Sequence, residues 1–234
     1  MNQPSSDADY LHKEYPKQFA KDDFWKQIKR TVNGESVSEH DIHLIVDQVA
    51  RHLEFSKNDH LLDLGCGNAA LGSHLFDLID RYTGVDFSEY LLEVAREYFH
   101  QPDKTQYMVA DIRNTDCYVV EAASATKVLI YGCISYLTKT EVRELLTELR
   151  RSLPKLKTVF IGNIADRSKA ADFFAARNID DFSLNDPTSP IGVWWDQSEI
   201  ADLVTEVGFS ARCVSMPKEF YGGSYRFDIV LQSI

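Results

Sequence analysis

The sequence predicts an α/β protein built on a doubly wound, mostly parallel sheet of seven strands. From position 60 onward, apolar runs of strand length alternate with amphipathic helical segments. Strands that are apolar on both faces and separated by helices are typical of a parallel sheet that helices cover on both sides. The last two strands, 211–216 and 225–232, are joined by a short helix-free connection, so we expect them to pair antiparallel.

Local patterns predict the individual elements. A helix at 38–53 has Ser38 as a suitable N-cap and an apolar stripe on one face. Thr138 and Glu141 have the spacing of a capping box, and the helix that they begin is expected to end before Pro154. The remaining elements are strands at 60–65, 81–88, 105–112, 126–132 and 157–164 and helices at 22–32, 68–79, 88–99 and 196–209.

The elements suggest a division of the chain. Residues 1–55 are expected to form an N-terminal helical cover, and residues 56–234 the main α/β domain. The alternation of strand and helix is interrupted at about 165–195. An irregular stretch of this length inside a compact domain is usually a lid or a binding loop, so we interpret it as an insert on the substrate side.

The composition is that of an acidic globular protein. Lysine and arginine total 25 against 36 aspartate and glutamate residues, a formal net charge of -11. A field of that sign repels phosphate backbones and disfavours nucleic acid as a partner. The longest apolar run, about ten residues, is too short to cross a bilayer, and no signal-peptide pattern is visible. Four cysteines without metal-ligand spacing predict reduced thiols in the cytoplasm and no metal site.

A small-residue loop follows the first strand of the sheet. In this loop, Gly65 and Gly67 stand two positions apart, and Asp63 precedes them within the strand. A tight turn without side chains lets a ligand lie against the backbone. The spacing also fits a dinucleotide fingerprint, with Ala70 as its third small residue and Asp86 about 20 residues beyond the loop.

Acids at three successive strand ends argue against a dinucleotide. Asp63, Asp86 and Asp111 end the first three strands of the sheet. A carboxylate at the position of Asp63 repels phosphate and attracts a cation. Three such acids suit a ligand with an ammonium group, a vicinal diol and an exocyclic amine. S-adenosylmethionine has all three, together with a cationic sulfonium and no phosphate.

On these residues, the chain resembles a class I S-adenosylmethionine-dependent methyltransferase, of Rossmann-like fold, from about position 39 to its end. The pattern Asp63-x-Gly65-x-Gly67 matches the first motif of the family, with Ala69 in place of its usual third glycine. The resemblance implies that Asp63 and the loop face the methionine part of the cofactor, that Asp86 accepts from the ribose, and that Asp111 accepts from the adenine. The implied cofactor-binding residues are Asp63, Gly65, Cys66, Gly67, Asp86, Phe87, Asp111, Ile112 and Tyr131.

The reacting side should lie at the exit of the fourth strand. Tyr136 and Asp166 are the candidate catalytic residues, with Asp166 as a general base or, alternatively, as the N-cap of the following helix. His12 and His40 are weaker candidates for a base. Lys29 and Arg30 are expected to meet either an anionic group of the substrate or the carboxylate of the cofactor. Further candidates for substrate contact, with core packing as the alternative role, are Cys133, Ser135, Arg167, Trp194, Trp195, Tyr221 and Tyr225.

The expected function is methyl transfer to a small molecule. Segments such as 22–39 and 189–195 resemble stand-alone methyltransferases of bacterial surface-polysaccharide or natural-product pathways. This resemblance favours an oxygen of a sugar or a related metabolite as the acceptor atom, although a phenol or an amine would give a similar sequence. Two alternatives stay open: a nicotinamide-dependent oxidoreductase, and a protein that keeps the cofactor pocket but only binds a partner. No nucleic-acid or membrane partner is expected, and the sequence does not determine the oligomeric state.

Overall fold

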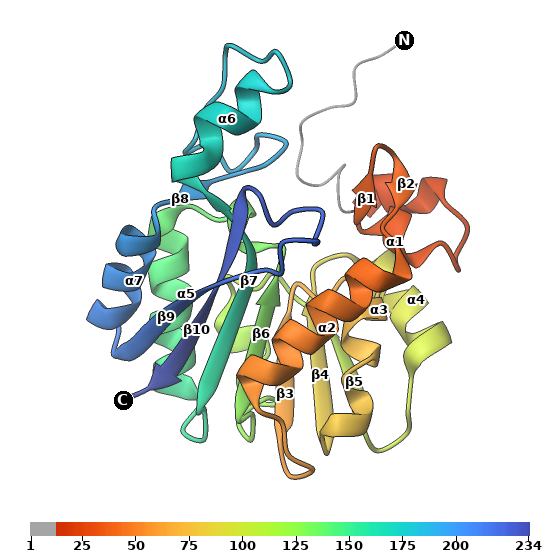
Figure 1. Ribbon diagram of the computed structural model, residues 1–234. Helices are drawn as coiled ribbons and strands as arrows, with labels where there is room; N and C mark the ends of the chain where they lie inside the picture. Colours follow the sequence, from red (N-terminus) through yellow and green to blue (C-terminus); the bar gives the residue numbers. More distant parts are fainter. Residues whose placement is uncertain (1–12) are drawn as a thin grey trace.

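The computed structural model describes residues 13–234, which form one large sheet with helices on both faces (Figure 1). The strands of this sheet are β3 (His60–Leu64), β4 (Arg81–Asp86), β5 (Thr105–Val109), β6 (Lys127–Tyr131), β7 (Thr158–Asp166), β8 (Trp194–Trp195), β9 (Phe209–Ser215) and β10 (Arg226–Ser233). Their order is β5-β4-β3-β6-β7-β10-β9, and β8 pairs with β7 outside this path. Strands β3 to β7 pair in parallel, whereas β10 is antiparallel to both β7 and β9. The predicted fold class is confirmed, with β8 as an additional strand.

Two helical layers cover this sheet. The helices are α1 (Phe24–Gln27), α2 (Glu39–Leu53), α3 (Ala70–Ser73), α4 (Glu89–Phe99), α5 (Lys139–Ser152), α6 (Ala170–Ala175) and α7 (Gln197–Glu206). Helices α2, α3 and α4 contribute to one hydrophobic cluster, and α5 and α7 to the cluster on the other face. Adjacent strand residues alternate between these clusters, as Leu61 and Leu62 do, because successive side chains of a strand point to opposite faces. Among the described helices, none is long and apolar enough to cross a membrane.

The predicted helix starts are confirmed where a side chain caps the helix. The Ser38 side chain accepts from the backbone N–H of Asp41 at 3.1 Å and begins α2. Thr138 and Glu141 form the reciprocal capping box of α5. In both helices, the cap satisfies a backbone N–H that has no partner within the helix.

Two predicted helices are wrong in extent. The helix expected at 22–32 is a single turn, α1, because Lys29 takes a left-handed conformation with φ of 54°. The chain then forms a hairpin of β1 (Thr31–Val32) and β2 (Glu35–Ser36). The helix expected at 68–79 is split into α3 and a separate 3-10 turn at 76–78, since the bond from Leu75 N–H to the Gly72 carbonyl already closes a tighter turn.

Two further segments, the β1–β2 hairpin and α6, lie at the carboxyl ends of the parallel strands. Figure 1 shows the β1–β2 hairpin and α6 above this edge of the sheet, on opposite sides of it. The α6 segment has its own aromatic cluster, in which Phe173 and Phe174 pack on Trp194 and Tyr225. Both pieces therefore border the edge where open α/β sheets bind their ligands.

Candidate functional site

The glycine loop follows β3 at this edge of the sheet. Gly65 and Gly67 both have positive φ, 73° and 56°. A Cβ on Gly65 would lie 2.7 Å from Cys133 Sγ, and a Cβ on Gly67 would lie 2.9 Å from Ile28 Cγ2. The backbone N–H of Gly65 donates to the Val85 carbonyl at 2.8 Å, which holds the loop against β4. Conformation and space thus both favour glycine at these two positions.

Two other residues complete the loop. The Cys66 thiol is buried beside Gly84, and burial raises its pKa. Ala69 has φ of 60°, in the left-handed region, and is fully buried. This is the position at which the resembled family usually has glycine, so the loop keeps a left-handed backbone there despite the added methyl group. A left-handed residue with a Cβ costs about 1–2 kcal/mol.

Asp63 is the last residue but one of β3, just before the loop. Its side chain is 4% exposed and accepts a hydrogen bond from Tyr82 Oη at 2.7 Å. Burial raises the pKa of Asp63 to about 7; the nearby charge of Asp86 acts in the same direction, while Arg30 acts in the opposite one. A cation next to this carboxyl group would favour its ionised form. The site therefore suits a positively charged ligand group.

Asp86 ends β4 and connects two parts of the site. Its carboxylate accepts from the backbone N–H of Gly67 at 2.9 Å and from that of Ser88 at 2.8 Å. Burial raises the pKa of Asp86 to about 6, although both backbone hydrogen bonds oppose this rise. The side chain that is predicted to accept from the ribose also fixes the glycine loop. Beside it, Phe87 lies under the ammonium group of Lys13, with Nζ 5.5 Å from the ring centroid.

Asp111 differs from the other two acids because it is ion-paired. Arg113 donates to it through Nε at 2.9 Å and also contacts Glu141 at 2.8 Å. This hydrogen bonding lowers the pKa of Asp111. The neighbouring Ile112 is buried, and its carbonyl accepts from Tyr118 Oη at 2.6 Å. An adenine amino group at Asp111 would therefore share the carboxylate with a guanidinium group.

The N-terminal segment lies over the glycine loop. Asn68 Nδ2 donates to the Phe24 carbonyl and to Gln27 Oε1, both at 2.9 Å. Ile28 follows directly and contacts the loop at Gly67. The two Asn68 hydrogen bonds join residues 44 and 41 positions apart, and sequence patterns gave no sign of them. His40 belongs to α2, whereas His12 lies outside the described residues.

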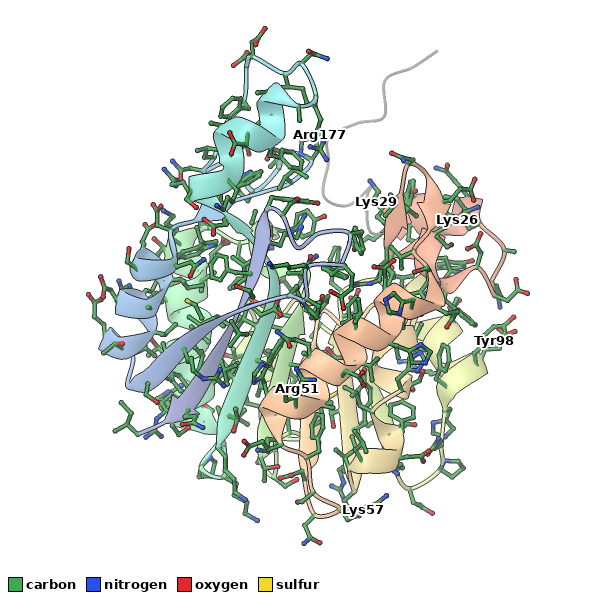
Figure 2. The ribbon with its side chains drawn as sticks, viewed as in Figure 1. Lys26, Lys29, Arg51, Lys57, Tyr98 and Arg177 are labelled. Carbon is green, nitrogen blue, oxygen red and sulfur yellow. The ribbon has the colours of Figure 1, made fainter. Side chains whose placement is uncertain are left out.

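A cavity of about 230 Å³ opens beside this loop. Its lining comes from the exits of β6 and β7, the N-terminal segment, the insert and the last loop. Ser135, Tyr136, Tyr221 and Tyr225 all line it, and so do Lys29 and Arg30. Figure 2 labels Lys29 at the edge of the N-terminal segment that faces the insert.

Other predicted residues lie outside the cavity lining. Trp194 and Trp195 are fully buried, so neither indole presents a surface to a ligand. Tyr131 is 6% exposed; its ring would be 2.4 Å from a Cβ on Gly162, and the Arg30 guanidinium lies 4.9 Å from the ring centroid. Tyr131 thus contacts Arg30, which lines the cavity, but does not line the cavity itself.

Asp166 has partners of its own. Its carboxylate accepts from Ser168 N–H at 2.9 Å, from Ser168 Oγ at 2.7 Å and from Gln197 Nε2 at 2.9 Å. These contacts are those of an N-cap, the alternative that sequence analysis gave for this residue. Arg167 contacts Asn185 and lies 3.5 Å from Asp196, so it ties the insert to the start of α7.

Sequence reasoning missed a polar group where β7 meets β10. Asn163 has φ of 67°, and its N–H donates to Asp228 Oδ1 at 2.8 Å across a register shift between the strands. Asp228 is fully buried, and burial raises its pKa to about 6. Arg226 donates to the Asn163 carbonyl at 2.6 Å. The available signal was an asparagine and an aspartate within otherwise apolar strands.

Carboxyl, cationic and phenolic groups make up the site. Residues 13–234 contain no cluster of three or more His, Cys, Asp or Glu side chains that would hold a metal ion. Cys66, Cys117, Cys133 and Cys213 are all free thiols. The site is thus built from buried carboxyl groups on one side of the glycine loop and cationic and phenolic groups on the other.

Comparison with known proteins agrees with this geometry. Residues 61–155 match a family model described as a methyltransferase domain. This segment resembles a methyltransferase domain. It spans β3 to α5 and so includes Asp63, the glycine loop, Asp86 and Asp111. No curated protein sequence matches the chain.

Solved methyltransferase structures share the fold. The magnesium protoporphyrin IX methyltransferase of Synechocystis PCC 6803, solved with bound SAH, aligns with a TM-score of 0.66 at 16% identity over 97% of each chain. The methyltransferase domain of bacterial CtHen1-C aligns with a TM-score of 0.59 at 18% identity, over 83% of this chain and 98% of that one. The small RNA methyltransferase HEN1 aligns with a TM-score of 0.63 at 12% identity, over 85% of this chain and 26% of that one. The family match and this fold support an S-adenosylmethionine-dependent methyltransferase of class I.

Proposed function

We propose that this methyltransferase transfers a methyl group from S-adenosylmethionine to an oxygen atom of a small-molecule acceptor. The observation that carries the proposal is that two parts of the site adjoin: the cofactor half-site, which is the glycine loop with Asp63, Asp86 and Asp111, and the cavity. Gly65 of the glycine loop packs on Cys133, and Gly132 and Ser135 on either side of this cysteine line the cavity. A ligand in the cavity and a ligand on the loop would therefore meet at the exit of β6.

The cofactor half-site has a role for each acid. We assign Asp63 to the ammonium group, because a buried carboxyl group with a pKa near 7 gains most from a cationic neighbour. We assign Asp86 to the ribose. Its carboxylate would accept hydrogen bonds from the ribose hydroxyls while it also accepts the one from Gly67 N–H. Asp111 and Ile112 would contact the adenine, with Phe87 beside the ring. S-adenosylmethionine supplies an electrophilic methyl group on a sulfonium.

The task of the protein is then to align the acceptor and to exclude water. Methyl transfer is an in-line displacement, and holding two reactants in line removes much of the entropic barrier. Tyr136 lines the cavity, and burial raises its pKa, so its hydroxyl group donates hydrogen bonds at neutral pH. We therefore propose Tyr136 as a group that orients the acceptor oxygen. A role of Asp166 as general base stays a prediction that turnover has to test.

The volume of the cavity and the net charge of the protein both favour a small acceptor. A cavity of about 230 Å³ holds a small metabolite or one part of a larger one. The net charge of -11 disfavours the phosphate backbone of RNA, which weighs against an RNA acceptor despite the shared fold with HEN1. A sugar hydroxyl and a phenol are both acceptors of this class.

Two measurements test the proposal together. S-adenosylhomocysteine is titrated into the protein by calorimetry, and the protein is then incubated with methyl-labelled cofactor and a pool of bacterial metabolites of low molecular mass. We expect one binding event and incorporation of label into small molecules. Binding without incorporation from any pool would favour the partner-binding alternative, and incorporation only into added RNA would contradict a small acceptor.

A further inference from the structure

The cavity is cationic in a protein that is strongly acidic. Lys29, Arg30 and Arg226 line it, and none of the described residues in its lining is an aspartate or a glutamate. With a formal net charge of -11 for the chain, three cations in one cavity of about 230 Å³ are a local reversal of sign. Such a reversal favours an anionic ligand through the focused field of the cavity.

Arg226 is held in place without a carboxylate. Its Nη1 donates to the Asn163 carbonyl at 2.6 Å, and its guanidinium lies 4.9 Å from the Tyr225 ring centroid. The buried Asp228 is near enough for Arg226 to lower its pKa, yet within residues 13–234 the two form no ion pair. A guanidinium has five donor N–H groups, so contact with one carbonyl leaves donors for a bidentate partner.

Lys29 and Arg30 also form no ion pair with any residue that the structure describes. Nearby, Lys26 pairs with Glu35 at 3.1 Å, whereas in the described part of the chain no carboxylate pairs with Lys29 or Arg30. Burial lowers the pKa of Lys29, whose Nζ lies 4.4 Å from the Tyr15 ring centroid. Lys29 is exposed as a residue, so its ammonium group loses only part of its water, and an anion beside it would offset that partial loss.

The two arginines occupy different parts of the cavity. Nε and Nη1 of Arg30 are buried and have no hydrogen-bond partner among residues 13–234, and the charge of Arg30 acts on Asp63 in the cofactor half-site. A Cβ on Gly132 would lie 3.6 Å from Arg30 Nη2 and 3.3 Å from Asn163 Nδ2, so Gly132 lies between this arginine and the residue that holds Arg226. Arg30 thus borders the cofactor, while Arg226 and Lys29 belong to the acceptor side.

We propose that the acceptor carries an anionic group, a carboxylate or a phosphate, and that Arg226 and Lys29 bind this group. The inference rests on the proposed function, because it assigns the cavity to the acceptor. A planar guanidinium and a flexible ammonium group from two separate segments of the chain would fix the acceptor by two charge-assisted hydrogen bonds or more. Tyr221 and Tyr225 then flank the part of the acceptor next to the anion.

The test uses the full chain saturated with S-adenosylhomocysteine. Inorganic phosphate and sodium acetate are titrated separately into the loaded protein and followed by NMR at constant ionic strength. We expect saturable binding of at least one anion, weakened ten-fold or more in R226Q and in K29Q. The anion that binds more tightly identifies the group. R212Q is the matched control, since Arg212 is exposed on β9 and contacts His52, away from the cavity; its anion affinity should equal that of the unmodified protein.

The outcomes separate the inference from the proposed function. Failure of S-adenosylhomocysteine to bind would contradict the proposed function itself. Cofactor binding without saturable binding of either anion, or equal anion affinity in R226Q and the unmodified protein, would overturn the inference alone. Because Arg226 bonds to Asn163, the thermal melt and cofactor affinity of R226Q are measured first; if R226Q does not fold, K29Q at an exposed position decides the test.

Discussion

The substitution Asp63→Asn should change stability and cofactor affinity in opposite directions. The Asp63 carboxyl group is 4% exposed and receives a hydrogen bond from Tyr82. Asparagine has nearly the same shape and can accept the same bond, but it carries no charge. The variant therefore removes the buried charge while it leaves the packing of β3 and β4 in place.

The pKa of Asp63 sets the expected size of the effect. A rise from 3.8 to about 7 on folding corresponds to roughly 4 kcal/mol above pH 7, since each pH unit is about 1.4 kcal/mol. The folded pKa is above the unfolded one, so this penalty is absent below pH 4, grows as pH rises and is complete above pH 7. We expect the cofactor-free D63N variant to be more stable by about 1–3 kcal/mol at pH 8, because an unpaired amide group cancels part of the gain.

Cofactor affinity should fall in the same variant. Loss of a hydrogen bond to a charged group costs about 1.5–3 kcal/mol, or roughly 10- to 150-fold in the dissociation constant. Urea unfolding at pH 5 and pH 8 and calorimetry with S-adenosylhomocysteine measure the two effects. A D63N variant that is less stable at pH 8, or that binds the cofactor as tightly as the unmodified protein, would refute this account of Asp63.

Asp59 provides the matched control at the other end of the same strand. It accepts from Thr126 Oγ1 at 2.6 Å and from the N–H and hydroxyl groups of Ser56 at 2.7 and 2.9 Å. These hydrogen bonds outweigh burial and lower the pKa of Asp59. The Asp59→Asn variant should therefore be less stable at pH 8 and should keep its cofactor affinity.

Three further substitutions test separate parts of the site. Asp86→Ala should weaken S-adenosylhomocysteine binding by about 1–3 kcal/mol in calorimetry, since the ribose and Gly67 lose their acceptor; unchanged affinity would place the ribose elsewhere. Asp166→Ala should lower the free energy of unfolding by about 0.5–2 kcal/mol with little change in turnover, whereas a 100-fold loss of turnover would identify a base. Ala69→Gly should raise the melting temperature, because glycine removes about 1 kcal/mol of left-handed strain. A lower melting temperature in this variant would contradict the claim that Ala69 is strained.

Most of the fold was predictable because its signals are local. Ser38 and the Thr138–Glu141 pair begin α2 and α5 through contacts three residues long. The strands were visible because both of their faces are buried, which leaves uninterrupted apolar runs. The helix expected at 22–32 failed because propensity does not report the left-handed turn at Lys29, which depends on how the segment lies on the glycine loop.

The site was predictable only where a motif carries it. The spacing of Asp63, Gly65 and Gly67 is local, so the sequence sufficed to identify the loop. The contact of Arg226 with Asn163 joins residues 63 positions apart and depends on the register shift between β7 and β10. No periodicity encodes such a contact, so the sequence indicated Lys29 and Arg30 as anion contacts but gave no sign that Arg226 joins them in one cavity.

The central claim is that buried carboxyl groups at the ends of β3 and β4 bind a phosphate-free, cationic adenosine cofactor on the glycine loop. Parallel calorimetric titrations with S-adenosylmethionine and with NADH at pH 8 test it most directly. The account predicts one S-adenosylmethionine site per chain and no heat of binding from NADH. Saturable binding of NADH together with no binding of S-adenosylmethionine would contradict it.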